Sequence, residues 1–524
     1  MTTNTRVTAT IDGTPVTVES GTTILAAAAQ AGIAIPSLCS YTGIEPPTSC
    51  FVCVVRIEGR KGLVPSCAAT VEEGMAVESS SNEITACRQR ALELLLSEHA
   101  GDCEAPCRRI CPCGMDIPTM IRHVARGDYR KAISVIKEDM PFPALLGHVC
   151  PAPCEKGCRR ANVDTTVAIR DLHRRVGLDD LNKETPLLPL CAQPTGKRVA
   201  LVGAGPAGMS VAWYLRLAGH QCTIFDHFHR AGGMLARGVA GNRLPLDVLD
   251  KETQLLEHLG VRFVFNTRVN DPAELAEDND ALVLATGEGG FSASGMKTGP
   301  KGIAVEAGTF LTSRARTFAC GGAILPGRTA VRSIGQGHDL ALVVDGFLRD
   351  GAPRPRHRLF DSRLTTIEPP EFDAFRLTSV AALVRHTGCN GAADMQVEAG
   401  RCLSCDCSAK HDCDIRMLAD RYAAVQKHYR TGGRRNAARH LQEHGVVYEP
   451  GKCILCGRCV GLTAGVTPGL SFVGRGFQTT VDGPLGASVS TAMGERSREC
   501  IEACPTGALW RLNRRSRNND TSEP

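Results

Sequence analysis

The sequence predicts a chain of several domains that combines α/β and α+β folds. Three observations support this prediction. The 524 residues are enough for several buried cores. A β-hairpin pattern near the N-terminus and a strand–glycine–helix pattern near residue 200 are typical of different fold types. The 25 cysteines lie mostly in short groups, which indicates sulfur-ligated metal.

Charge and hydropathy exclude two classes of partner. The 60 basic and 55 acidic residues are spread along the chain and leave a net charge of only +5, so no nucleic-acid partner is expected. No apolar run approaches the roughly 20 residues that span a bilayer, and the first residues contain no secretory signal. We therefore expect no transmembrane segment and a cytoplasmic location. Since disulfides rarely persist there, the cysteines are expected to bind metal.

Residues 1–80 are predicted to form a ferredoxin-like domain. The alternating stretch RVTATIDGTPVTVES indicates a β-hairpin, and TTILAAAAQAGIAI indicates a helix. A loop with one C-x2-C pair follows, where a zinc ribbon would usually have two, so we expect a [2Fe–2S] cluster on Cys39, Cys50, Cys53 and Cys67. The stretch IPSLCSYTGIEPPTSCFVCVV resembles the N-terminal domain of the large iron–sulfur subunit of bacterial NADH:quinone oxidoreductase (complex I). A β-grasp fold is expected for it.

Residues 81–185 are predicted to form a helical domain with two [4Fe–4S] clusters. The stretch IPTMIRHVARGDYRKAISVIKED is helical in composition, and a cysteine group lies on each side of it. This region resembles the iron–sulfur domain of the glutamate synthase small subunit and of dihydropyrimidine dehydrogenase. The resemblance implies one cluster on His99, Cys103, Cys107 and Cys158. It implies a second on Cys111, Cys150 and Cys154, with His173 as fourth ligand and Cys113 as its rival.

Residues 196–350 are predicted to form a single Rossmann-like domain that binds FAD. In RVALVGAGPAGMSVAWYLRLAGHQCTIFD, a strand leads into a glycine motif and a helix, and a second strand ends at Asp226. The glycines of the motif allow a tight turn and close approach of the backbone to a pyrophosphate: Gly203, Gly205 and Gly208. Asp226 is expected to bind a ribose hydroxyl. The fingerprint alone does not separate FAD from NAD.

Three later segments resemble the flavin-binding segments of the glutamate synthase small subunit. They are AGGMLARGVAGNRLP, LVLATG and TFACGGAILPGRTAVRSIGQG, and the resemblance adds to the expected FAD contacts Gly233, Thr286, Gly287 and Gly321. Gly322 stands where the family usually has an aspartate. In the family a second nucleotide domain separates the last two segments. Here only a short stretch without a second GxGxxG motif lies between Gly287 and Phe318, so we expect the NAD(P)H domain to be absent.

Two further cysteine groups follow. Residues 351–395 are predicted as a linker, and residues 396–445 as a cysteine-rich helical segment. That segment contains four cysteines with the unusual spacing C-x2-C-x-C-x5-C: Cys402, Cys405, Cys407 and Cys413. A [4Fe–4S] cluster, a zinc ion, and partial or no metal binding all remain open for them.

Residues 446–515 are predicted to form a bacterial-ferredoxin-like domain with one [4Fe–4S] cluster. YEPGKCILCGRC begins the ferredoxin cysteine run, but Thr463 stands where the pattern has its fourth cysteine. In two-cluster ferredoxins each run donates its last cysteine to the other cluster. The expected ligands are therefore Cys453, Cys456, Cys459 and Cys504. A second cluster would keep only Cys500 and is expected to be absent. The segment also resembles the large subunit of complex I.

Taken together, these patterns predict an iron–sulfur flavoprotein, an oxidoreductase subunit that passes electrons between partner proteins through [2Fe–2S], [4Fe–4S] and FAD. The expected partners are other oxidoreductase subunits, such as an NADH/flavin subunit or a catalytic reductase or dehydrogenase. Two alternatives are a self-contained NAD(P)H-dependent oxidoreductase of the glutamate synthase small subunit type and a non-catalytic assembly subunit. We assign no catalytic residues, because the sequence contains no acid pair or catalytic dyad.

Overall fold

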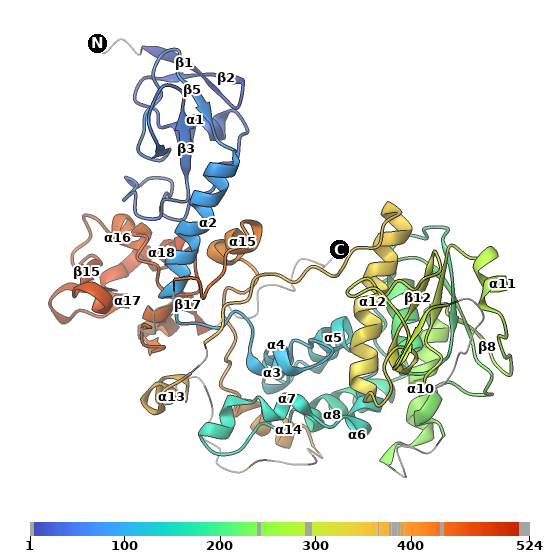
Figure 1. Cartoon of the computed structure of the whole chain (residues 1–524). Helices are drawn as coiled ribbons and strands as arrows, with labels where there is room; N and C mark the ends of the chain where they lie inside the picture. The colour runs from blue at the N-terminus through green and yellow to red at the C-terminus, as the bar shows by residue number, and fades with distance from the viewer. Residues whose placement is uncertain are drawn as a thin grey trace. The chain divides into compact units, whose positions relative to one another are not determined.

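The computed structural model describes residues 5–237, 243–288, 296–364, 366–376, 379, 385, 388, 391–429 and 434–512. Contacts divide the chain into two units, each built from segments that are not consecutive in the sequence (Figure 1). Unit 1 contains Met1–Glu104, Leu359–Thr378 and Cys405–Pro524. Unit 2 contains Ala105–Arg358 and Ser379–Ser404. Most of the chain between Glu104 and Cys405 therefore belongs to unit 2.

The N-terminal sheet of unit 1 begins with the predicted hairpin. Strands β1 (Arg6–Ile11) and β2 (Thr14–Glu19) pair antiparallel around Asp12 and Gly13, whose φ angles are 49° and 79°. The strand order is β2-β1-β5-β3-β4, with β5 parallel to β1. The other strands are β3 (Val54–Ile57), β4 (Leu63–Pro65) and β5 (Ala76–Glu78). Alanines of helix α1 (Ile24–Gln30) share a buried core with this sheet.

A second core of unit 1 joins segments that are far apart in the sequence. Helix α2 (Asn82–Ser97), which Ser81 caps, contributes Leu92 and Leu96. Helix α15 (Asp414–Arg421) contributes Ile415 and Ala419. The same core contains cysteines from three predicted groups: Cys39, Cys50, Cys413 and Cys456.

The C-terminal part of unit 1 has a three-stranded sheet in the order β13-β14-β17. Its strands are β13 (His440–Leu441), β14 (Val446–Tyr448) and β17 (Leu509–Arg511). Three short helices and a hairpin complete this part: α16 (Arg458–Leu462), α17 (Val489–Met493), α18 (Ser497–Ala503), β15 (Ser471–Val473) and β16 (Thr480–Asp482). The segment that was predicted as a linker also reaches into unit 1, with helix α13 (Pro369–Arg376) and the buried Ser362.

The first half of unit 2 is helical. Its helices are α3 (Pro106–Ile110), α4 (Ile117–Ala125), α5 (Tyr129–Asp139), α6 (Pro143–Val149), α7 (Pro153–Lys156), α8 (Ile169–Leu181) and, from the returning segment, α14 (Ala392–Gly400). The stretch that composition predicts as one helix is divided into α4 and α5. Gly127, with a φ of 79°, turns the chain between them.

The second half of unit 2 is a parallel sheet in the order β12-β9-β6-β7-β8. Its strands are β6 (Arg198–Val202), β7 (Gln221–Phe225), β8 (Arg262–Val264), β9 (Ala281–Leu284) and β12 (Thr317–Ala319). The associated helices are α9 (Pro206–Leu217), α10 (Leu246–His258), α11 (Pro272–Glu277) and α12 (Ala330–Asp350). Among the described residues 296–316, the chain forms the short hairpin β10 (Thr298–Gly299) and β11 (Gly302–Ile303) and no helix.

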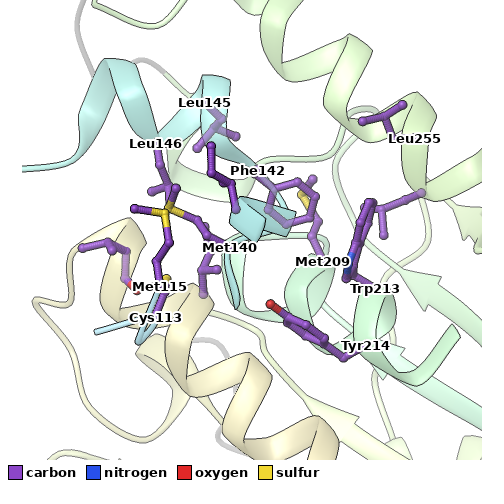
Figure 2. Packing of buried hydrophobic residues seen from close by; sticks show 14 of the residues in the cluster. Cys113, Met115, Met140, Phe142, Leu145, Leu146, Met209, Trp213, Tyr214 and Leu255 are labelled. Carbon is purple, nitrogen blue, oxygen red and sulfur yellow. Dashed lines mark hydrogen bonds between the residues drawn. The ribbon is translucent and has the colours of Figure 1, made fainter. Parts of the chain in front are cut away.

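One buried core joins the helical half of unit 2 to its sheet. Figure 2 shows Phe142 and Met209 beside Trp213, and the Phe142 and Trp213 rings meet edge to face at 6.0 Å. Cys113 and Met115 belong to the same core. The segment around Cys113 also packs closely against α12. At Gly335 the two backbones are so near each other that an added Cβ atom would lie 2.1 Å from the carbonyl oxygen of Pro112. The cysteine-rich loop and the dinucleotide-type sheet therefore pack as one body.

Candidate metal centres and dinucleotide site

The first predicted cysteine set converges in unit 1. Cys39, Cys50, Cys53 and Cys67 are all buried. The thiols of Cys50 and Cys67 lower the pKa of Cys39, and the thiol of Cys67 lowers the pKa of Cys53 to about 6, so the four side chains lie close enough to interact. Thr48 and Phe51, in the loop that carries these cysteines, have φ angles of 52°, which non-glycine residues rarely adopt. The arrangement suits thiolate ligands that share one cluster.

A cavity of unit 1 brings together four potential ligands from two distant segments. His99 and Cys103 follow helix α2, while Cys407 and Cys413 precede helix α15, and all four line the cavity. The backbone N–H of Cys407 donates to the carbonyl of Cys103 at 3.1 Å and holds the two segments together. Burial, with a smaller contribution from the charge of Cys407, raises the pKa of Cys103 to about 12.

His99 has the properties of a metal ligand in this cavity. Its Nδ1 is buried and has no hydrogen-bond partner. Burial, and then the positive charge of Lys452, lower the pKa of His99 to about 4, so the imidazole is neutral. A neutral imidazole with a buried nitrogen that has no hydrogen-bond partner has the properties of a metal ligand rather than of a hydrogen-bonded core histidine. Cationic side chains, Lys410 and Arg416, also line this cavity.

This grouping differs from both sets that were predicted for these residues. Cys107 and Cys158, the expected partners of His99 and Cys103, lie in unit 2, as does Cys402. There, all three are partly buried against the main core. Cys405 lies in unit 1 but is not among the residues that line the cavity. The sequence offers little signal for the pairing of Cys103 with Cys407, because most of unit 2 lies between them in the chain.

The predicted C-terminal set lines one apolar cavity of unit 1: Cys453, Cys456, Cys459 and Cys504. Burial raises the pKa of Cys453 to about 11 and that of Cys456 to about 12. Cys500 is fully buried and does not line this cavity. Thr463 closes the turn after α16, because its hydroxyl donates to the carbonyl of Cys459 at 3.0 Å and accepts from the N–H of Leu470 at 2.9 Å.

Unit 2 holds the remaining predicted set. A hydrogen bond from Cys113 lowers the pKa of Cys111 to about 7. Burial raises the pKa of Cys150 to about 11, with a further contribution from the charge of Cys111. Burial and the charges of Cys111 and Cys150 raise the pKa of Cys154 as well. The thiols of this set are therefore close enough to interact electrostatically.

The two candidates for the fourth ligand of this set have different surroundings. His173 is buried on α8, and its Nδ1 lies 3.2 Å from the carbonyl oxygen of Pro143. Burial lowers the pKa of His173 to about 4. A backbone carbonyl on one ring nitrogen is the usual way to orient a histidine whose other nitrogen binds metal. The thiol of Cys113 lies 3.5 Å from the carbonyl oxygen of Val331, and it also interacts with Cys111 and Cys150, so it lies beside the set.

The glycine fingerprint sits between β6 and α9, at the carboxyl edge of the parallel sheet. Gly203 has a φ of 109°, and a Cβ atom there would lie 2.3 Å from the carbonyl oxygen of Ala285. A Cβ at Gly208 would lie 2.1 Å from the carbonyl oxygen of Gly203. Gly205 is the N-cap of α9, and a Cβ atom there would meet only the Cα of Gly233, at 4.0 Å. This geometry leaves the helix N-terminus accessible to a pyrophosphate.

Residues that were predicted beside the fingerprint organise its loops. The carboxylate of Asp226 accepts from the N–H of Ala204 at 2.7 Å and from that of Phe228 at 2.9 Å, so it also fixes the fingerprint turn. Thr286 Oγ1 is buried without a hydrogen-bond partner. Gly287 and Gly321 have φ angles of 78° and 68°. A dinucleotide would satisfy the orphaned hydroxyl of Thr286 and fit the open cradle of glycines.

Among the described residues, no group of three or more His, Cys, Asp or Glu side chains could hold a single metal ion. No helix in the described part of the chain is long and apolar enough to cross a membrane.

Family models match three regions of the chain. Residues 4–82 match a 2Fe-2S iron–sulfur cluster binding domain. Residues 75–185 match dihydropyrimidine dehydrogenase domain II, a 4Fe-4S cluster domain. Residues 201–260 match an NAD(P)-binding Rossmann-like domain. These matches confirm the predicted mixed α/β multidomain class and both cluster types, and they fit a dinucleotide cofactor.

Three curated relatives illustrate the similarity. The NADP(+)-dependent formate dehydrogenase subunit beta of Moorella thermoacetica is 37% identical over 35% of this chain and 29% of its own length. The glutamate synthase [NADPH] small chain of Bacillus subtilis is 37% identical over 34% of this chain and 36% of its own. The NAD-dependent dihydropyrimidine dehydrogenase subunit PreT of Escherichia coli is 32% identical over 37% of this chain and 49% of its own length.

The matched region therefore spans less than half the length of each of these relatives. The predicted resemblance to the glutamate synthase small subunit and to dihydropyrimidine dehydrogenase is confirmed. The chain thus combines a [2Fe–2S] domain, a [4Fe–4S] domain and a Rossmann-like dinucleotide domain, and its relatives are oxidoreductases, several of them subunits.

Proposed function

We propose that this chain is an electron-transfer subunit of a larger oxidoreductase, in which iron–sulfur clusters and FAD pass electrons between partner proteins. The observation that carries the proposal is the common core of unit 1. Cys39 and Cys50 of the [2Fe–2S] set, Cys413 of the His99 cavity and Cys456 of the C-terminal set all belong to it. Ligands from three candidate sites thus share one apolar core, which suits a relay that excludes water.

We propose four ligand sets. Cys39, Cys50, Cys53 and Cys67 hold a [2Fe–2S] cluster. The other sets hold [4Fe–4S] clusters: His99, Cys103, Cys407 and Cys413; Cys453, Cys456, Cys459 and Cys504; and Cys111, Cys150 and Cys154 with His173. When bound, such clusters accept and release single electrons. The protein contributes buried thiolates, neutral imidazoles and apolar walls, which fix the ligands and limit solvent access.

FAD is the dinucleotide that we propose for the Rossmann-like domain. The N-terminus of α9, with Gly205 and Gly233 beside it, would hold the pyrophosphate, and the hydroxyl of Thr286 would donate to the cofactor. When bound, a flavin exchanges electrons in pairs with one partner and singly with clusters. The packing of Gly335, at the start of α12, against Pro112 places the cysteine loop of unit 2 beside this domain.

Electrons enter from a partner rather than from nicotinamide in this proposal. Support comes from the short connection between β9 and β12, where the described residues form only β10 and β11. One glycine fingerprint serves one dinucleotide. The proposed partners are an NADH/flavin subunit and a catalytic reductase or dehydrogenase subunit, with the cytoplasm as the expected location.

Two measurements on the anaerobically purified full chain test this function. Iron analysis should give about 14 atoms per chain, for one [2Fe–2S] and three [4Fe–4S] clusters, and more if Cys107, Cys158 and Cys402 also bind iron. In stopped-flow mixing, dithionite should bleach the visible absorbance, whereas NADH and NADPH should not. Bleaching by NADH or NADPH at about 10 per second would instead support a self-contained NAD(P)H-dependent oxidoreductase. Iron and flavin near zero would support an assembly subunit.

A further inference from the structure

Lys452 is a buried cation that none of the predicted sites uses. Only 4% of its surface is exposed, and it immediately precedes Cys453. Its side chain runs past Gly101, because a Cβ atom at Gly101 would lie 2.8 Å from Lys452 Cγ and 2.9 Å from Lys452 Cε. The same Cβ atom would lie 3.3 Å from His99 Nε2. The lysine chain and the imidazole of His99 therefore flank the same glycine, at the edge of the His99 cavity.

The ammonium group of Lys452 is held in its charged form by an ion pair with Glu449, whose Oε2 lies 2.7 Å from Lys452 Nζ. The side chain that carries this charge lies beside His99, one of the four proposed ligands, because both side chains flank Gly101.

The carboxylate that holds Lys452 in place also serves other groups. Glu449 Oε2 lies 2.7 Å from Lys452 Nζ. Glu449 Oε1 accepts from Trp510 Nε1 at 2.8 Å and lies 3.5 Å from Arg439 Nε. One buried carboxylate therefore faces two buried cations, Lys452 and Arg439. This network fixes the position of the ammonium, and the group of one carboxylate and two cations carries a net positive charge.

We propose that Lys452 is a positioning residue for electron transfer, whose charge raises the reduction potential of the cluster on His99, Cys103, Cys407 and Cys413. The inference rests on the proposed function, because it assumes that these four residues hold a [4Fe–4S] cluster. Reduction adds one electron to the cluster, and a fixed positive charge in a buried, low-dielectric site stabilises the added negative charge. The histidine ligand acts in the same direction.

The test is an EPR-monitored redox titration of the full chain. Loss of one signal in His99→Ala identifies the cluster. Lys452→Met removes the charge and keeps most of the side-chain volume. This substitution should lower the equilibrium constant for reduction of the cluster about tenfold, which for a one-electron step lowers its reduction potential by about 59 mV. Lys452→Arg should restore the original potential. Lys427→Met, which removes an exposed lysine of the same unit, is the matched control and should leave it unchanged.

A second variant keeps the proposal testable if Lys452→Met fails to fold. Glu449→Gln removes the negative partner, and it should shift the same signal toward higher potential. An unchanged potential in Lys452→Met with full iron content, or in Glu449→Gln when Lys452→Met does not fold, overturns the role of Lys452. If His99→Ala retains every cluster signal and all its iron, the proposed ligand set itself is wrong, which is a different failure.

Discussion

Gly507 offers a test of the His99 cavity that only the tertiary structure suggests. It lies three residues beyond Cys504 and touches the opposite ligand segment. A Cβ atom at Gly507 would lie 2.2 Å from Cys407 Sγ, and 3.5 Å from both Ala409 Cβ and Ser408 Oγ. Its φ angle is not in the left-handed region, so alanine meets no backbone penalty there. The effect of Gly507→Ala should therefore come from the contact with the sulfur alone.

The magnitude follows from that distance. Non-bonded heavy atoms are most stable at about 3.5–4.0 Å, so the sulfur of Cys407 has to move by about 1.5 Å. Overpacking of this kind costs about 1–3 kcal/mol in a buried site. A ligand displaced by this amount can no longer share a cluster with His99, Cys103 and Cys413. We expect Gly507→Ala to lose about four iron atoms per chain and to keep the [2Fe–2S] signal.

Iron analysis and EPR spectroscopy of the reduced, anaerobically purified variant provide the assay. Gly346→Ala is the matched control, since a Cβ atom at Gly346 meets nothing within 4 Å. The control should keep all its iron and every cluster signal. If Gly507→Ala also keeps the iron content and EPR spectrum of the unmodified chain, then Cys407 does not bind iron beside Gly507, and the reasoning is refuted.

Three other predictions concern unit 2. Asp226→Ala should lower flavin occupancy and loosen the fingerprint turn, because it removes a charged hydrogen bond with the N–H of Ala204 that is worth about 1.5–3 kcal/mol. Unchanged flavin content per folded chain would contradict this prediction. His173→Ala should remove a [4Fe–4S] signal while Cys113→Ser keeps it, and EPR showing the reverse would make Cys113 the ligand. Burial raises the pKa of Glu252 from 4.5 to about 8. The protonated side chain therefore contributes its full share to the free energy of unfolding below about pH 4.5, and this contribution is lost as the pH rises through about 8. Melting temperatures of Glu252→Gln should therefore fall less between about pH 5 and about pH 8 than those of the unmodified chain, and equal slopes would exclude this role.

Local patterns determined much of the fold. Alternating residues around Asp12 and Gly13 form the β1–β2 hairpin, because side chains on a strand alternate between a buried and an exposed face. The fingerprint of Gly203 forms the predicted strand, turn and helix, since only glycine permits its close backbone approaches. The cysteines of the C-terminal set also line one cavity, because Cys453, Cys456 and Cys459 lie within seven residues of the sequence.

Long-range packing decided the rest. The sequence places His99 and Cys103 next to Cys107, and it places Cys407 and Cys413 next to Cys402. The structure divides both groups between two units and brings His99 and Cys103 to Cys407 and Cys413. The spacing of ligands along the sequence predicts only sites formed by one continuous segment. This cavity is formed by separate segments, one that ends where the chain leaves unit 1 and others that begin where it returns. The buried charges of Lys452 and Arg416 near these ligands likewise depend on which helices and loops pack together, and no local pattern specifies that packing.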